Sequence, residues 1–119
     1  MKLGFMCAMS NNGIRTLDEI VSEIQAGEAL GFDQVWMAQV FSTDAITALS
    51  IAARETTAIK LGTAVVPSYP RHPTSLAIQA LTASAASQGR FELGLGLSHK
   101  MLIEDMYGIP YEKPAQHMR

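Results

Sequence analysis

The sequence is poor in cysteine, in aromatic residues (7%) and in charged residues (17%). Its single cysteine, Cys7, excludes an internal disulfide framework and fits the reducing cytosol, so we expect a cytoplasmic protein. The formal net charge of −2 shows no basic excess that would favour nucleic acid as a partner. All apolar runs are shorter than the roughly 18 residues of a membrane span, and residues 1–6 are too short for a signal peptide. We therefore expect neither nucleic acid nor membrane as a partner.

Apolar residues make up 48% of the 119 positions, enough for a real core and too many for a disordered chain. Short apolar runs alternate with amphipathic segments at intervals of about 30 residues, the length of one strand–helix unit. The first helix is predicted to begin with a capping box, Thr16 with Glu19, and to end at a left-handed Gly31. The second helix is capped by Asp44 or Thr43, and Pro73 suits the start of the third. The predicted strands are 3–6, 35–38, 61–66 and 91–97, and the helices are 17–30, 45–53, 74–87 and 101–107.

Strands separated by helices predict a parallel sheet covered by helices. Two architectures compete: an open doubly wound sheet, and the N-terminal half of a (β/α)8 TIM barrel with four parallel strands. A whole barrel needs about 250 residues, so this chain would supply about half of one.

Ligands of parallel α/β folds bind at the carboxyl ends of the strands. Four cationic or titratable side chains follow the third and fourth predicted strands: Arg71, His72, His99 and Lys100. They either receive an anionic ligand or are solvated loop charges.

Several familiar motifs are absent or incomplete. Gly94 and Gly96 begin a dinucleotide fingerprint, but His99 stands where its third glycine belongs. Because they lie within a strand, these glycines indicate close packing or close approach by a ligand. The three histidines and Cys7 lack metal-site spacing, so we expect no metal, and we expect Cys7 and Trp36 to be buried core residues.

EALGFDQVWMAQ (residues 28–39) resembles the first-helix-to-second-strand segment of the luciferase-like monooxygenase superfamily, whose (β/α)8 barrels use flavin or deazaflavin. IKLGTAVVPSYPRHP (59–73) and GRFELGLGLSHK (89–100) resemble the third and fourth strands of the branch that uses the deazaflavin coenzyme F420. EDMYGIPYEKPAQHMR (104–119) resembles the segment leading toward the fifth strand.

The resemblance implies a bulge in the third strand, often with a non-prolyl cis peptide, that backs the central ring of the cofactor. This position matches Ala64–Val65, flanked by Thr63 and Val66. Gln39 matches a position that often faces the cofactor. Arg71 and His72 match the loop near it, and Ser98, His99 and Lys100 lie where a tail phosphate or substrate could be met.

The implied function is an oxidoreductase in which hydride passes between reduced F420 and a small organic substrate, with no single residue assigned a catalytic role. The alternatives are an FMN-dependent monooxygenase and a non-catalytic half-barrel or binding module. We expect residues 1–119 to form one partial barrel domain that stops after the fourth strand and following helix. Its exposed strand edges predict pairing with a second copy or with a C-terminal half.

Overall fold

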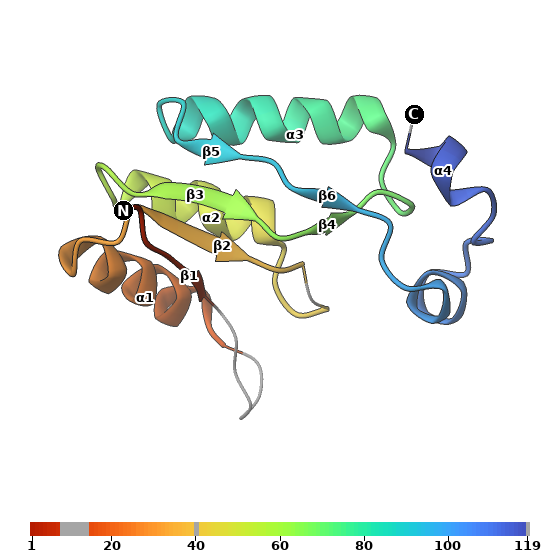
Figure 1. Cartoon of the computed structure of the whole chain (residues 1–119), viewed down its shortest axis with the longest axis horizontal. Coiled ribbons are helices and arrows are strands. Elements are labelled where there is room, and N and C mark those ends of the chain that lie inside the picture. The colour runs from red at the N-terminus through yellow and green to blue at the C-terminus, as the bar shows by residue number, and fades with distance from the viewer. Residues whose placement is uncertain (8–14, 40, 119) are drawn as a thin grey trace.

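The computed structural model describes residues 1–7, 15–39 and 41–118, in which strands and helices alternate (Figure 1). In chain order the elements are β1 (Gly4–Cys7), α1 (Leu17–Ala29), β2 (Gln34–Met37), α2 (Ala45–Arg54), β3 (Lys60–Thr63), β4 (Val66–Pro67), α3 (Pro73–Ala86), β5 (Phe91–Glu92), β6 (Leu95–Gly96), the π-helix η1 (Leu102–Met106) and α4 (Pro114–His117). The main sheet is parallel, with the strand order β1, β2, β3, β5. Beyond β3 and β5 the same two segments continue as β4 and β6, which pair in parallel in a second, two-stranded sheet.

The strand order decides between the two predicted architectures. Each strand of the main sheet lies beside its predecessor, so every crossover advances in the same direction. Since crossovers between parallel strands are right-handed, α1, α2 and α3 fall on one face, with α2 in contact with both of the others. A doubly wound sheet would reverse its order at one point. The half-barrel prediction is confirmed, and the doubly wound alternative is wrong.

The core lies between the sheet and the three long helices. Val35, Met37 and Leu61 point from the strands into this layer, where they are fully buried with Ile24 of α1 and Leu49 of α2. Burying such side chains stabilises the fold by about 1.5–3 kcal/mol each. The intervening strand positions face the opposite way and lie outside this core.

The predicted helix starts are confirmed by their caps. Thr16 Oγ1 accepts the amide of Glu19 at 3.2 Å, and the Glu19 carboxylate accepts the amide of Thr16 at 2.7 Å, which completes the capping box. Asp44 caps α2 by accepting the amide of Thr47 at 2.9 Å. Gly31 has φ +86°, the left-handed conformation predicted for it.

Three predictions about elements need correction. Trp36 is half-buried on the face opposite the helices and is not part of the core. The predicted helix 101–107 is a five-residue π-helix, η1. The third and fourth strands are each interrupted, giving β3 and β4, and β5 and β6.

The interruption follows from a one-residue offset between neighbouring strands. Leu61 and Gly62 pair with Phe91 and Glu92, and pairing resumes with Val66 opposite Leu95. Three residues, 63–65, therefore lie opposite two, 93–94. This is a β-bulge, which bends the strand and redirects its side chains.

Arg90 ties the amino end of the sheet to two helix ends. Its guanidinium donates to the carbonyls of Ala53 at 2.7 Å, Ile59 at 2.8 Å and Ser87 at 2.9 Å. These oxygens belong to the carboxyl ends of α2 and α3 and to the approach to β3, so one cation satisfies acceptors from three segments.

Replacing Arg90 should therefore destabilise the whole fold. We expect Arg90→Ala to lower the free energy of unfolding by about 3 kcal/mol, because several partly buried carbonyls lose their donor. Arg90→Lys should recover only part of this loss, since an ammonium lacks the planar fork. Urea unfolding measures the effect. Arg54→Ala, at an exposed position of α2, is the control and should change stability by less than about 0.5 kcal/mol.

Candidate functional site

The carboxyl ends of the strands meet at one end of the sheet. All strand pairs are parallel, so the loops after β2, β4 and β6 leave from the same end. Residues 8–14, which follow β1, lie outside the described residues. This end is where ligands of parallel α/β folds bind.

The face of the sheet opposite the helices is built from large side chains that cover glycines. The indole of Trp36 lies against Gly62 of the next strand, where a Cβ would collide with the ring, and its Nε1 comes near Gly4 of β1. The side chain of Val65 lies in the same way against Gly94 and Gly96. Because the glycines leave room, both side chains lie low on the sheet and form a shallow apolar floor. We call this surface the inner face.

Main-chain hydrogen bonds join the bulge to the end of β2. The amide of Ala64 donates to the carbonyl of Met37 at 2.9 Å, and the amide of Gln39 donates to the carbonyl of Val65 at 3.3 Å. The Ala64–Val65 peptide is cis, as the resemblance predicted. Val65 is 42% exposed, so its side chain is accessible from the inner face.

The polar side chains predicted beside the bulge bind the protein itself. Thr63 is buried, and its hydroxyl donates to the carbonyl of Gly94 and accepts the amide of Gly94, both at 2.9 Å. The Gln39 amide accepts from the amide of Ala45 at 2.9 Å and donates to the carbonyl of Thr43 at 3.4 Å. The side chains of Thr63 and Gln39 therefore bind backbone groups beside the site.

Arg71 is held in an ion pair that sequence reasoning missed. Its guanidinium lies 2.6 Å from the Asp44 carboxylate and also donates to Gln79 at 2.9 Å. Burial raises the pKa of Asp44, but the hydrogen bonds from Arg71 and Thr47 and the charge of Arg71 outweigh burial and lower it. The pair ties the loop after β4 to the start of α2. Asp44 had been recognised only as a helix cap, because nothing in the sequence links it to Arg71.

The remaining predicted residues at this end of the sheet are His72, Ser98, His99 and Lys100. His72 caps α3, its Nδ1 accepting the amide of Thr74 at 3.2 Å. Ser98 adopts φ +63°, and its carbonyl accepts the hydroxyl of Tyr111 at 3.4 Å. His99 and Lys100 are exposed, and Lys100 lies 3.9 Å from Glu104. Within the described part of the chain, no hydrogen bond or ion pair joins the cations of the two loops, so they share an end of the sheet without forming one cluster.

Aromatic contacts at this end were also not predicted. Tyr69, after β4, stacks on His117 with ring centroids 3.9 Å apart and on Tyr111 at 4.8 Å. Phe41 and Tyr107 meet at 6.0 Å. These contacts fasten the segment after β6 to the loops after β2 and β4, and they join residues too far apart in sequence for a local pattern to reveal.

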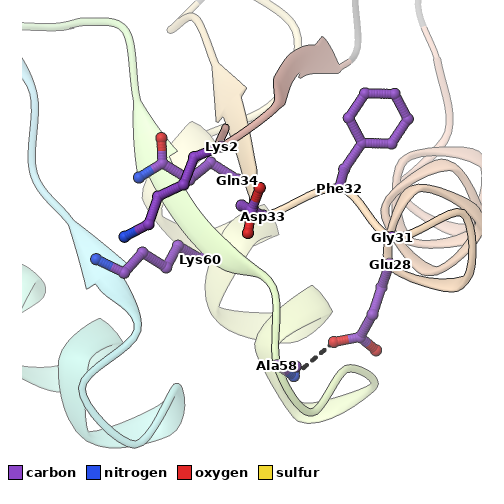
Figure 2. Close-up of a pocket in the computed structure, with 8 residues that line it drawn as sticks. All are labelled: Lys2, Glu28, Gly31, Phe32, Asp33, Gln34, Ala58 and Lys60. Atoms are coloured by element: carbon purple, nitrogen blue, oxygen red, sulfur yellow. Dashed lines mark hydrogen bonds between the residues drawn. The ribbon is translucent and has the colours of Figure 1, made fainter.

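A cavity of about 330 Å³ lies at the opposite, amino end of the strands (Figure 2). Two of its charged groups are bound within the protein: Glu28 accepts the amides of Thr57, Ala58 and Ile59, and Lys60 pairs with Glu92 at 2.9 Å. Burial raises the pKa of Glu28, but these amides and the charge of Arg90 outweigh burial and lower it. Such closed networks at this end of a barrel serve stability.

Comparison with known proteins identifies the family. The model of the luciferase-like monooxygenase family matches residues 1–119. The chain belongs to the luciferase-like monooxygenase family. The resemblance stated from the sequence is thereby confirmed. Among the described residues, no helix is long and apolar enough to cross a membrane.

Relatives of this luciferase-like chain are longer proteins. A Mycobacterium tuberculosis protein named as a coenzyme F420-dependent oxidoreductase is 38% identical over 96 residues, which are 81% of this chain and 28% of that protein. The F420-dependent tetrahydromethanopterin reductase of Methanopyrus kandleri has a TM-score of 0.79 and 27% identity over 92% of this chain and 30% of its own. The FMN-bound oxygenating constituent of 3,6-diketocamphane monooxygenase from Pseudomonas putida has a TM-score of 0.88 and 20% identity, covering all of this chain and 36% of its own. The chain thus spans about a third of these proteins.

The Asp44–Arg71 pair should matter for stability. We expect Asp44→Ala to lower the free energy of unfolding by about 2 kcal/mol, because α2 loses its cap and Arg71 its partner. Asp44→Asn keeps a capping oxygen and should lose about 1 kcal/mol. Because the pKa of Asp44 is lowered, its ionised form stabilises the fold above the ordinary value of about 3.9, and this benefit disappears as pH falls through the folded value. Denaturant unfolding at several pH values should show the gap to Asp44→Asn closing in acid, whereas Asp105→Asn, at an exposed position, should show no such gap.

Cys7 should behave as an inert core thiol. It is 1% exposed, and burial raises its pKa to about 12. We expect a thiol reagent at neutral pH to modify Cys7 only as fast as the protein unfolds. Labelling in native buffer and in urea, followed by mass spectrometry, tests this. Rapid labelling of the native protein would contradict it.

Proposed function

We propose that this chain forms the ring-binding part of an F420-dependent oxidoreductase. The observation that carries the proposal is the inner face, where Trp36 and Val65 lie low over glycines and leave a flat apolar floor beside the bulge. A flat ring fits such a floor, and the relative named as an F420-dependent oxidoreductase supports the deazaflavin. The deazaflavin, when bound, supplies hydride-transfer chemistry toward a small organic substrate.

The residues of the chain would orient this ring and shield it. Ala64 and Val65 would back it from the bulge, while Gln39 and Thr63 hold that bulge in place. His99 and Lys100 are exposed side chains of the loop after β6, so we assign to them and to Ser98 the contact with an anionic tail or substrate. Arg71 and His72 would act indirectly by fixing the loop after β4.

We further propose that the inner face is completed by additional strands. The sheet leaves β1 and β5 at its edges within the described residues, and the relatives are about three times as long. A C-terminal half or a second copy would cover these edges and close the pocket around the substrate.

Cofactor titration tests the proposal directly. Trp36 is the only tryptophan and lies on the inner face, so a bound ring should quench its emission. We expect F420 to quench in a saturable manner and FMN to bind at least about tenfold more weakly. Trp36→Phe should abolish the fluorescence signal while a shift in cofactor absorbance persists.

The alternatives predict different results. Stronger binding of FMN than of F420 would favour the hypothesis of an FMN-dependent monooxygenase, which the fold of the FMN-bound relative also allows. Absence of binding by either cofactor, in a folded chain, would contradict the proposal and favour a non-catalytic module. His99→Ala and Lys100→Ala should weaken F420 binding, and Arg71→Lys should leave it within about threefold, because its ion pair with Asp44 can still form.

A further inference from the structure

The bulge lacks the regular ladder that flanks it on both sides. Pairing stops at Gly62 opposite Glu92 and resumes at Val66 opposite Leu95. Within this gap, the Thr63 hydroxyl both donates to and accepts from the backbone of Gly94 at 2.9 Å. The Thr63 side chain thus bonds the amide of Gly94 and shares the Gly94 carbonyl with the amide of Val66, where regular pairing resumes.

Two glycines allow residues 63–65 and the neighbouring segment 93–96 to approach closely enough for this arrangement. A Cβ on Gly94 would collide with the carbonyl oxygen of Thr63, so only glycine allows the approach. A Cβ on Gly96 would lie 2.5 Å from a methyl carbon of Val65. The height of Val65 above the sheet is therefore set by Gly96 beneath it and by Thr63 at the start of the bulge.

We propose that Thr63 is a positioning residue that, through Gly94 and without touching the cofactor, fixes Val65 at the height the ring requires. This inference rests on the proposed function, because Val65 is the surface offered to the ring. Thr63 is 1% exposed and both hydrogen-bonding roles of its hydroxyl are used, so it acts on the ring only through the backbone.

The test compares two threonines of similar burial and bonding. Thr63→Val removes both hydrogen bonds while keeping the side-chain shape, and Thr63→Ser keeps the hydroxyl. Thr56→Val is the matched control: Thr56 is 6% exposed, and its hydroxyl donates to Ala52 and accepts from Arg90 at the other end of the sheet. Each variant is titrated with F420 by Trp36 quenching and unfolded in urea.

We expect Thr63→Val to weaken F420 binding by about tenfold or more, Thr63→Ser to bind nearly as the wild type, and Thr56→Val to lose stability with unchanged affinity. Equal losses of affinity in the two valine variants, or failure of serine to restore binding, would show that Thr63 contributes only to stability. Gly96→Ala should also weaken binding, because the new methyl group displaces Val65 while the Thr63 hydrogen bonds remain.

Amide hydrogen exchange tests the positioning role in the cofactor-free chain. The amide of Gly94 donates to Thr63, and the amide of Val66 donates to the carbonyl of Gly94 at 2.9 Å. Thr63→Val should speed exchange at both amides more than the loss of global stability accounts for, and Thr56→Val should not. Unchanged relative protection would overturn the inference. A wild-type chain that binds no F420 would instead contradict the proposed function, so the two failures are distinguishable.

Discussion

The one-residue offset between residues 63–65 and 93–94 is the constraint on which the site depends. Regular pairing on both sides fixes where the extra residue must be accommodated, and the buried core behind β3 prevents the chain from bulging toward the helices. The side chain of Val65 therefore lies on the inner face, whereas Thr63 is buried. Gly94 and Gly96 leave room for Val65, which is partly exposed.

The predicted cationic and histidine side chains after β4 and β6 do not all face a ligand. Arg71 pairs with Asp44, and Nδ1 of His72 accepts a helix amide, so both side chains are engaged within the protein in the described structure. In the loop after β6, the side chains of His99 and Lys100 are exposed to solvent.

How much the sequence could predict depended on the range of each interaction. The caps formed by Thr16 and Asp44 were predictable because the donor and acceptor lie three residues apart. The spacing of apolar runs predicted alternating strands and helices but left open a doubly wound sheet or half of a barrel, and the observed strand order decided between them. The offset at the bulge was not derivable from alternation, since a run such as 61–66 reads the same whether or not one residue is unpaired; only the family resemblance indicated it. The Asp44–Arg71 pair and the stack of Tyr69 on His117 join separate loops, and no local pattern encodes them.

The two ends of the sheet differ in the contacts that their side chains make. At the amino end, Glu28 and Arg90 bind several backbone groups each, and these contacts join helix ends to β3. At the carboxyl end, the side chains of Phe41, His99 and Lys100 are exposed, and the contact of Phe41 with Tyr107 joins the loop after β2 to the segment after β6 without entering the core. Substitutions at the exposed loop positions of the carboxyl end should therefore cost less folding free energy than substitutions in the Arg90 network or in the Asp44–Arg71 pair. Thr63, Gly94 and Gly96 lie between these two ends and hold the bulge through contacts of their own.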